Sequence, residues 1–411
     1  MRKIVVIEPA SSAFMFLVSP QTYEQQIGER VGVHVIRTKD NLDASVGLIQ
    51  QFADTDTVID NLDIANVIGA VEKLDNVCAI LAGIEYSVST ALEVAEYFNL
   101  PHMPKESLPF VRDKKSFRKK ITDAKLSQIA HLNITKTSAI NIPLDFPFPA
   151  VLKPSDMAGS IKVKKVNNKD EVIALANEIW DSNLTDLSYH SEGELQLEEY
   201  IDGKEYSIEG IVYNDSDDVV ITSITDKLLG AEPYFVEIGH ISNKKFDPVF
   251  TQNAHQYTKD IIKAIGLKSS VFHLELRKKA NGDIVAIEIA ARLAGFHMIE
   301  LCDIATGVNL AMAIVAHHLN LPYDMTRKRD EVAGIFYIEN FEKDIYQGLS
   351  GVDSIINDPA CLEFHECFKI GDPISKERDF SCLLAYFKMK HPDQAYIDNL
   401  IERIKHDVVI N

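Results

Sequence analysis

Short β-branched runs alternate with helical stretches over the first hundred residues, and this pattern constrains the fold more than any other feature. The apolar runs lie at 4–9, 33–37, 57–60 and 77–83, and the helical stretches lie near 21–31, 42–53, 63–73 and 85–98. The alternation predicts a parallel sheet whose faces are covered by crossover helices. Glu8-Pro9-Ala10-Ser11 stands where a G-x-G-x-x-G would follow the first run, so we expect a Rossmann-like sheet without a dinucleotide site.

The rest of the chain changes to mixed helices and antiparallel strands. A Pro-rich segment at 100–110 precedes a basic helix at 113–126 and indicates a boundary near residue 105. Strands are expected at 147–154, 160–166, 194–201, 205–213, 219–225, 271–279 and 283–292, and helices at 168–180 and 250–265. A further segment begins after Asp330 and ends in a helix near 393–407. We therefore predict an α/β and α+β chain with four units, 1–105, 106–195, 196–330 and 331–411.

Composition limits the classes of function. The 411-residue chain has 42 basic and 61 acidic residues and a net charge of −19. This charge repels nucleic-acid phosphates and anionic membranes, so it favours small-molecule or metal chemistry. The sequence shows no C-x-x-C pair, signal-peptide pattern or 18-residue apolar span, which indicates a cytoplasmic protein. We expect the five cysteines to be core residues, and a homodimer is left open.

The segment 271–292 carries the most informative polar pattern. Asn281-Gly282 is the strongest signal for a two-residue type I′ hairpin turn, which pairs Ala280 with Asp283. In that register Glu275 lies directly opposite Glu288, with Cβ atoms about 4.5–5.5 Å apart. The face that these glutamates share also carries His273, Arg277, Ala290 and Arg292, and the other face carries Leu274, Leu276, Ile287 and Ile289.

Two carboxylates directly opposite one another repel, so this pair needs a cation or a shared proton. Carboxylate oxygens without thiolates suit Mg²⁺ or Mn²⁺, and Mg²⁺ held by one or two carboxylates completes its shell with phosphate oxygens and water. A site for a metal and a nucleotide is therefore one interpretation of the hairpin. The alternative is a solvated strand face on which Arg277 and Arg292 neutralise the two glutamates.

Two other segments carry cations suited to phosphate. Lys153 ends a strand before the loop 156–160, and a strand-loop-strand of this kind can cover phosphates with backbone N–H groups and one positive charge. Lys114 and Arg118 are four residues apart on the basic helix and share one face. A solvated helix face is the plain alternative for the second pair.

A bend further along the chain suits the other end of a nucleotide. Residues 198–201 end one strand, Asp202-Gly203 forms a turn, and Glu205 opens the next strand. Exposed backbone groups at such a bend suit the edge of an adenine ring, and Glu205 suits ribose hydroxyls as a hydrogen-bond acceptor. An ordinary hairpin rich in solvated Glu fits the same pattern, so both interpretations stay open.

Taken together and in this order, these segments resemble those of ATP-grasp enzymes over nearly the whole chain. The resemblance implies an ATP-grasp fold with an N-terminal Rossmann-like pre-ATP-grasp domain, a mobile lid subdomain and a small C-terminal cap domain, and it implies ATP and Mg²⁺ as cofactors. The implied roles are phosphate binding for Lys114, Lys153, Gly159 and Ser160, adenine binding for Glu198, Glu199 and Ile201, ribose binding for Glu205, metal binding for Glu275 and Glu288, and stabilisation of the transferred phosphoryl group and the acyl intermediate for Arg292.

Two positions depart from the family pattern. The family usually has E-x-N on the second metal strand, whereas Glu288-Ile289-Ala290 lacks the Asn oxygen and leaves one or two Mg²⁺ ions open. The loop 156–160 contains a single glycine. Neither change removes a carboxylate or a lysine, so activity is still expected.

Within this superfamily, the sequence is most similar to the L-amino acid ligases. The similarity lies in the stretches VFHLELR, AIEIAARLAGFHMIELCDIATGVNL, IVVIEPASS, VAGIFYIENF and EPYFVEIGHISN. By that resemblance Glu237 binds a substrate ammonium group, and His240 orients the substrate or the acyl phosphate. Lys153, Arg292 and His240 are then the implied catalytic residues.

The implied reaction joins two L-amino acids into a dipeptide. ATP phosphorylates the carboxylate of the first amino acid and leaves as ADP, and the amine of the second amino acid then displaces phosphate. The alternatives are an ATP-grasp carboxylase, a purine-pathway ligase, or a nucleotide-binding regulatory protein without turnover. The identity and order of the amino acids and the base for the incoming amine stay open, and Glu237 with the acidic composition allows a basic first residue such as arginine.

Overall fold

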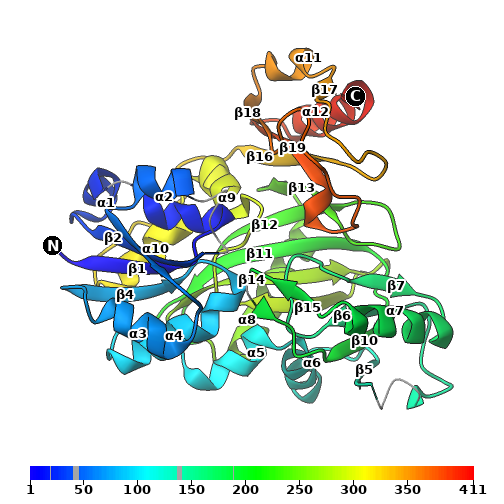
Figure 1. The fold of residues 1–411 in the computed structure, drawn as a ribbon, viewed down its shortest axis with the longest axis horizontal. Helices are drawn as coiled ribbons and strands as arrows, with labels where there is room; N and C mark the ends of the chain where they lie inside the picture. The colour runs from blue at the N-terminus through cyan, green and yellow to red at the C-terminus, as the bar shows by residue number, and fades with distance from the viewer. Residues whose placement is uncertain (19, 40–45, 137–140, 188) are drawn as a thin grey trace.

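The computed structural model describes residues 1–18, 20–39, 46–136, 141–187 and 189–411, and three sheets dominate its fold (Figure 1). The N-terminal sheet is parallel, with the strand order β3-β2-β1-β4. Its elements are β1 (Lys3–Ile7), η1 (Ser11–Leu17), α1 (Pro20–Ile27), β2 (Gly32–Thr38), α2 (Val46–Phe52), β3 (Thr55–Ile59), α3 (Ile64–Val71), β4 (Val77–Ala82), η2 (Glu85–Ser87) and α4 (Val88–Tyr97). The predicted alternation of strands and helices is confirmed, and 42–45 of the second predicted helix lie outside the described residues.

A second sheet, here called the lid sheet, has the order β5-β10-β6-β7 and is antiparallel. Its strands are β5 (His131–Ile134), β6 (Ala150–Pro154), β7 (Lys164–Val166) and β10 (Leu195–Glu199), and α7 (Lys169–Asp181) and the short strands β8 (Thr185–Asp186) and β9 (Tyr189–His190) lie between β7 and β10 in the chain. Helix α7 packs on one face of this sheet, against Leu152 and Leu197. Because side chains alternate along a strand, Lys153 and Glu198 point to the opposite face.

The central sheet has eight strands in the order β15-β14-β11-β12-β13-β16-β19-β18. They are β11 (Lys204–Val212), β12 (Val219–Leu229), β13 (Glu237–Ser242), β14 (Ser270–Lys278), β15 (Ile284–Ala290), β16 (Val332–Glu339), β18 (Cys361–Glu366) and β19 (Leu383–His391). Helices α6 (Lys114–Asp123) and α8 (Pro248–Ile265) bury Phe117 and Ile261 in one cluster with Leu274 of this sheet. The short helices η3 (Lys105–Ser107) and α5 (Leu108–Arg112) connect α4 to α6.

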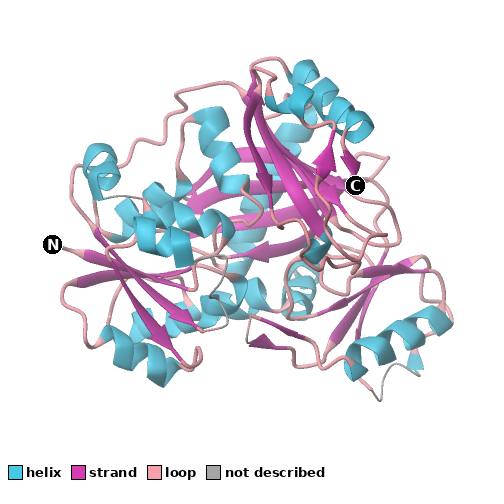
Figure 2. Cartoon of the chain, turned by 45° about the horizontal axis from the view of Figure 1, so that its top comes forward, coloured by secondary structure: helices cyan, strands magenta, loops and turns pink. Residues whose placement is uncertain are grey.

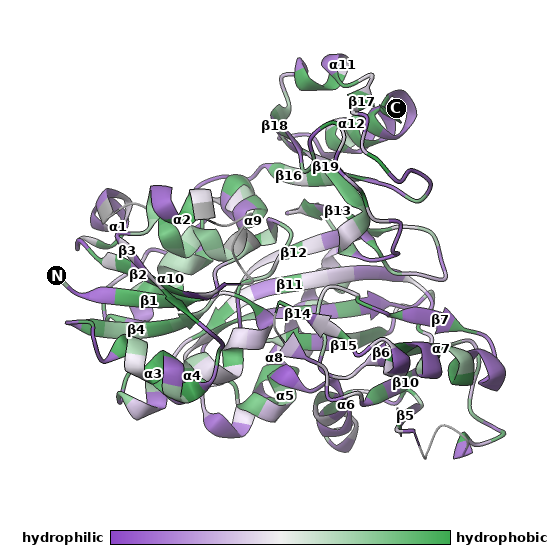
Figure 3. Cartoon of the chain, in the orientation of Figure 1, coloured by the Kyte–Doolittle hydropathy of each residue, from purple (hydrophilic) through white to green (hydrophobic). Residues whose placement is uncertain are grey.

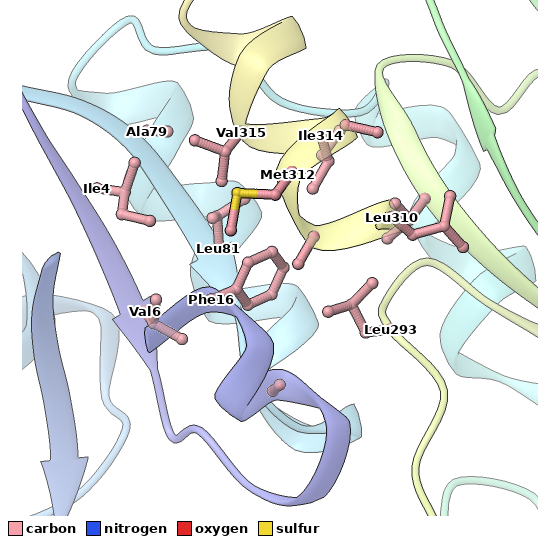
Figure 4. Packing of buried hydrophobic residues seen from close by; sticks show 14 of the residues in the cluster. Ile4, Val6, Phe16, Ala79, Leu81, Leu293, Leu310, Met312, Ile314 and Val315 are labelled. Carbon is pink, nitrogen blue, oxygen red and sulfur yellow. The ribbon is translucent and has the colours of Figure 1, made fainter. Parts of the chain in front are cut away.

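Two helices that no sequence pattern predicted fill the space between the N-terminal and central sheets. They are α9 (Met298–Thr306) and α10 (Leu310–His318). Residues Leu310–Ala316 of α10 are all buried, because the helix is apolar around its whole circumference. Figure 4 shows Leu310, Met312 and Ile314 packed with Ile4 of β1 and Phe16 of η1 in one core cluster. In Figure 3, β1 and β4 are hydrophobic over most of their length, as strands covered on both faces require.

The C-terminal residues extend the central sheet and add a small helical layer (Figure 2). Helix α12 (Gln394–Asp407) packs Ile397 and Leu400 against Phe387 of β19. The other elements are α11 (Asp353–Ile356), η5 (Phe380–Cys382), β17 (Leu349–Ser350) and β20 (Val409–Ile410). The unit boundaries given above stay predictions, since β16, β18 and β19 belong to the same sheet as β11–β15.

The hairpin β14–β15 does not have the predicted turn. The backbone N–H of Lys279 donates to the Asp283 carbonyl at 2.8 Å, and that of Gly282 donates to the Lys279 carbonyl at 3.0 Å. The loop therefore contains three residues, 280–282, and Ala280 does not pair with Asp283. Gly282 has φ +93°, a left-handed conformation that a three-residue loop of this kind favours for glycine.

A bulge in the middle of the same hairpin restores the predicted pairing. Leu276 lies opposite Ala286, one position off the predicted register, whereas Glu275 lies opposite Glu288 as predicted. The bulge lies after Glu275, and Ile287 is the extra residue on β15. The face-to-face glutamates are therefore confirmed, although the turn from which they were predicted is wrong.

Among the described residues, no single helix is both long enough and apolar enough to cross a membrane. Helices α9 and α10 reach such a length and composition only as a pair, and the chain bends by 96° between them.

Candidate active site

A cleft lies between the lid sheet and strands β11, β13, β14 and β15 of the central sheet. Of the residues to which the family resemblance assigns a role, all except His240 line it, namely Lys114, Lys153, Gly159, Ser160, Glu198, Glu199, Ile201, Glu205, Glu237, Glu275, Glu288 and Arg292. Ile287 also lines the cleft, because the bulge moves it off the apolar face on which it was predicted. The fold thus brings together residues from positions 114 to 292.

At the base of the lid sheet, one buried carboxylate lies between two cations. Glu198 Oε2 accepts from Lys153 Nζ at 2.8 Å, and Glu198 Oε1 accepts from Arg118 Nε at 2.6 Å. Burial opposes ionisation of Glu198, but the charges of Arg118 and Lys153 outweigh burial and lower its pKa to about 2. We call these three residues the lid-base cluster.

Arg118 does not take the phosphate-contacting position that its spacing from Lys114 suggested. Its side chain is fully buried, and it also donates to the Ala286 carbonyl at 2.7 Å. It is therefore a structural cation that joins helix α6, the lid sheet and β15. Lys114, by contrast, lines the cleft, where its Nζ lies 2.9 Å from Glu288 Oε2.

The loop 156–160 is held by hydrogen bonds at its N-terminal end. Asp156 accepts from the Tyr189 hydroxyl at 3.1 Å, from Ser191 Oγ at 2.8 Å and from the Glu192 N–H at 2.8 Å. Lys114 Nζ donates to the Met157 carbonyl at 2.6 Å. Gly159 has φ +67°, and a Cβ at this residue would come 3.1 Å from the ring of Phe380. Its one glycine therefore stands at the position where the loop turns closely against the C-terminal segment.

An apolar slot lies where the chain leaves the lid sheet, at residues 198–201. Ile201 forms a cluster with Ile129, Val285 and the bulged Ile287, and Ile201 and Ile287 both line the cleft. The turn after Ile201 needs glycine, because a Cβ on Gly203 would lie 2.0 Å from the Lys278 carbonyl oxygen. Apolar side chains at the end of a strand suit an aromatic base.

Glu275 and Glu288 face the cleft from paired strands, and each offers one oxygen to a ligand. Glu275 uses Oε1 for both Lys227 and His273, and Glu288 uses Oε2 for Lys114. Neither the other oxygen of Glu275 nor that of Glu288 has a hydrogen-bond partner within the part of the chain that the structure describes. Two carboxylate oxygens of this kind fit a hard divalent cation such as Mg²⁺.

The protein supplies few further metal ligands. Within the described ranges, no group of three or more His, Cys, Asp or Glu side chains is arranged to hold a metal ion. Ala290, at the third position of the E-x-N pattern, is buried and has no oxygen in its side chain. A cation bound by Glu275 and Glu288 would therefore take most of its ligands from water and from a nucleotide, as Mg²⁺ commonly does.

Three carboxylates from three strands surround one buried lysine on β12. Lys227 Nζ lies 2.9 Å from Glu205 Oε1 and 3.1 Å from Glu237 Oε1, and it also contacts Glu275 Oε1. Burial alone would lower the pKa of Lys227, but the three carboxylates raise it well above its ordinary value. We call Lys227 and these three glutamates the Lys227 cluster.

Each carboxylate of the Lys227 cluster has a second polar partner. Arg277 Nε donates to Glu205 Oε2 at 3.0 Å, and His273 Nε2 lies 3.2 Å from Glu275 Oε1. Burial would lower the pKa of His273, but Glu209 and Glu275 raise it to about 10. Arg277 and His273 therefore each hold one carboxylate of the cluster, and Lys227 lies at its centre among the three carboxylates.

His240 lies behind Glu237 and does not line the cleft. It is fully buried, and its Nε2 lies 2.9 Å from Glu237 Oε2. Burial, together with the charge of Lys227, lowers the pKa of His240 well below its ordinary value, so the ring is neutral. Burial raises the pKa of Glu237 to about 7, with Lys227 opposing the rise. The predicted direct contact between His240 and a substrate is therefore replaced by contact with Glu237.

Arg292 is held by a residue of the N-terminal sheet region. Its Nε donates to Glu85 Oε2 at 2.6 Å, and Arg112 Nη1 donates to Glu85 Oε1 at 2.5 Å. Burial opposes ionisation of Glu85, but Arg292 and Arg112 outweigh it and lower its pKa to about 2. Arg112 also lies 5.7 Å from the ring centroids of Tyr86 and Tyr189, which stack on each other.

Sequence patterns did not point to Lys227, Glu85 or Arg112. The predicted strand at 219–225 stopped two residues short of Lys227, and β12 runs on to Leu229. Extending its alternation would have placed Lys227 on the same face as Ser223 and Thr225, a sign of a polar interior face. Glu85 lies three residues after the end of β4, at the carboxyl end of a parallel strand, where binding residues gather in sheets of this type.

Residues 146–300 match the ATP-grasp domain family. Over 253 residues the chain is 24% identical to the alanine–anticapsin ligase of Bacillus subtilis, an alignment that covers 58% of this chain and 53% of that protein. The chain spans between about a fifth and about a half of the length of the curated relatives it matches.

Two solved structures share the fold along the whole chain. An L-amino acid ligase from Bacillus licheniformis superposes with a TM-score of 0.82 and 16% identity, over 100% of this chain and 98% of that one. The biotin carboxylase domain of the 2-oxoglutarate carboxylase from Hydrogenobacter thermophilus, solved with MgADP and bicarbonate, gives a TM-score of 0.72 and 16% identity, over 100% of this chain and 91% of that one.

Proposed function

Because this chain carries an ATP-grasp domain within a full-length ATP-grasp fold, we propose that it is an ATP-dependent ligase that joins two L-amino acids into a dipeptide. ATP would phosphorylate the first amino acid on its carboxylate, and the amine of the second would displace phosphate from the acyl phosphate. The products are a dipeptide, ADP and phosphate. The full-length superposition on the Bacillus licheniformis L-amino acid ligase, with a TM-score of 0.82, supports the fold that this reaction uses.

The observation that carries the proposal is the pairing of Glu275 with Glu288 across the cleft from Lys153. Carboxylates on one wall and a lysine on the other suit a triphosphate that binds together with a divalent cation. Mg²⁺ held by Glu275 and Glu288 would supply charge neutralisation for the transferred phosphoryl group. Lys114 and Lys153 would bind the phosphate oxygens, and loop 156–160 would cover them with its backbone.

The adenosine end of the nucleotide would lie in the apolar slot. Ile201 and Ile287 would contact the adenine ring, and the backbone of 198–201 would contact its edge. Glu205 would accept hydrogen bonds from the ribose hydroxyls. Its carboxylate is held by Arg277 and Lys227.

The amino acid would lie between Arg292 and Glu237. The guanidinium of Arg292 would stabilise the transferred phosphoryl group and the acyl intermediate, with its orientation set by Glu85. Glu237 would accept from the substrate ammonium group, and the neutral His240 would keep the Glu237 carboxylate in place. Both oxygens of Glu237 already have partners in the protein. Glu237 is therefore better suited to one further contact with the ammonium group of the amino acid than to binding a cationic side chain of the substrate as well.

The proposal is tested by measuring ADP release with the twenty amino acids, singly and in pairs. Release that depends on a pair, with a dipeptide of matching mass in the product, supports the ligase. ADP release that depends on bicarbonate and not on amino acids would support a carboxylase, the function of the structural relative from Hydrogenobacter thermophilus. Tight binding of Mg·ATP without turnover under all these conditions would support a regulatory protein.

A further inference from the structure

Lys227 contacts three carboxylates, and the proposed function assigns a different ligand to each of them. Glu205 is assigned to the ribose, Glu275 to the metal ion and Glu237 to the amino acid. Only 1% of the Lys227 side chain is exposed, against 10–12% for the three glutamates. Lys227 therefore lies behind the wall of the cleft, and the glutamates lie between it and any ligand.

The sheet order explains how one lysine reaches all three. The strands run β14-β11-β12-β13, so Lys227 on β12 has Glu205 and Glu275 on one side and Glu237 on the other. Its cross-strand partner on β13 is His240, which holds the second oxygen of Glu237. The three carboxylates share the attraction of one ammonium group. If one of them moves, the electrostatic field at Lys227 changes, and the most favourable positions of the other two carboxylates change with it.

We infer that Lys227 is a positioning residue that couples the nucleotide end of the cleft to the amino acid end. Glu205 and Glu237 make no direct hydrogen bond or ion pair with each other in the described structure, and Lys227 is their shared partner. A ligand that reorients Glu205 or Glu275 would change the carboxylate that receives the amino acid. This inference rests on the proposed function for the identity of the ligands, but the contact network itself is independent of it.

The test is a double-mutant cycle that uses Mg·ADP as the probe. Affinity is measured by calorimetry for the wild type, Glu205→Gln, Glu237→Gln and the double variant. We expect the two effects to be non-additive by about fivefold in the dissociation constant, because both substitutions act on Lys227. In the background of Lys227→Met the same cycle should become additive within about twofold. Additive effects in the wild-type background would overturn the inference. This part of the test uses only the glutamate variants, so it can be carried out even if Lys227→Met does not fold.

Lys388 provides the matched control for a buried lysine between carboxylates. Its Nζ lies 2.8 Å from Glu300 Oε1 and 2.7 Å from Glu363 Oε2, and only 4% of its side chain is exposed. Lys388→Met should lower the melting temperature without changing the non-additivity of the Glu205–Glu237 cycle. A loss of non-additivity in Lys388→Met would mean that the coupling reports general stability, which would overturn the specific role of Lys227.

The same measurements separate this inference from the proposed function. If wild-type protein binds Mg·ADP and the cycle is additive, the inference fails and the ligase proposal stands. If wild-type protein binds no Mg·ADP, the ATP-dependent function fails and the inference fails with it. If the cycle is non-additive in the wild type and additive in Lys227→Met, the coupling is supported whatever acceptor the amino acid screen reveals.

Discussion

The two buried charge clusters on either side of the cleft use the same residue types in opposite proportions. In the lid-base cluster, one carboxylate, Glu198, lies between Arg118 and Lys153, and its pKa falls to about 2. In the Lys227 cluster, one lysine lies among three carboxylates, and the pKa of Glu237 rises to about 7. The lid side is therefore cation-rich, and the central-sheet side is carboxylate-rich.

This difference indicates which ligand charge each wall is built to receive. A buried ion pair gains little stability over apolar packing, because both charges must lose water. The lid-base cluster keeps a surplus of positive charge, whereas on the central-sheet wall one oxygen each of Glu275 and Glu288 has no partner in the described structure. The lid wall suits phosphate, and the central-sheet wall suits a divalent cation and an ammonium group.

The largest expected effect comes from removing a carboxylate of the proposed metal pair. Glu288→Gln should lower Mg²⁺-dependent ADP formation by about a thousandfold or more, because the amide cannot neutralise the metal charge. The matched control is Glu363→Gln in the C-terminal region, which should keep turnover within about twofold. ADP formation at the wild-type rate by a folded Glu288→Gln variant would contradict the metal assignment and remove the distinction between the two walls.

Acid titration should distinguish the lid-base cluster by its effect on folding stability. The pKa of Glu198 is about 2 in the folded protein against 4.5 ordinarily, so its stabilisation is present above pH 4.5 and is lost as the pH falls from 4.5 towards 2. The difference between these pKa values corresponds to about 3 kcal/mol. Urea midpoints of wild type and Glu198→Gln should therefore approach each other as the pH falls from 4.5 towards 2.

The control for the acid titration is a carboxylate in a solvated ion pair. Glu178 pairs with Lys162 at 3.1 Å, and 57% of its side chain is exposed. Glu178→Gln should change the free energy of unfolding by only a few tenths of a kcal/mol at any pH. A stability difference between wild type and Glu198→Gln that stayed constant from pH 7 to pH 3 would show that the carboxylate is not held ionised by its neighbours.

The site on the central sheet was predictable from the sequence because its key pair is local. Glu275 and Glu288 lie on one hairpin, so a turn signal and strand alternation were enough to place them face to face. The turn was nevertheless wrong by one residue, and the bulge at Ile287 corrected the register further along. Bulges depend on packing against neighbouring strands, and a hairpin sequence alone does not fix their position.

The lid-base and Lys227 clusters were not predictable as clusters. Glu198 meets Arg118 across 80 residues of sequence, and Lys227 meets Glu275 across 48. Such pairs depend on how whole sheets pack, which leaves no periodic signal in the sequence. Helix α10 escaped prediction for a related reason: it is apolar on all sides, so it shows no amphipathic pattern.

An intermediate effect is expected from the lysine of the lid-base cluster. Lys153→Met removes the lysine that pairs with Glu198 and lines the cleft. We expect the affinity for Mg·ADP to fall by about fifty- to a hundredfold, because a charge-assisted contact with phosphate is lost. Lys162→Met, a lysine of the same region that pairs with Glu178, is the control and should change this affinity less than twofold. Equal loss of affinity in both variants would mean that general lid charge, and not Lys153, binds the phosphates.

The smallest expected effect lies at the carboxylate with the raised pKa. Glu237→Gln should raise the KM for one amino acid about tenfold, because an amide cannot ion-pair with the ammonium group, and should leave the dissociation constant of Mg·ADP within about threefold of the wild type. Because the pKa of Glu237 is about 7, the wild-type KM for that amino acid should rise as the pH falls from 8 to 6, whereas the KM of Glu237→Gln should change little. A variant that loses Mg·ADP affinity as strongly as amino acid affinity would contradict the assignment of Glu237 to the amino acid end of the cleft.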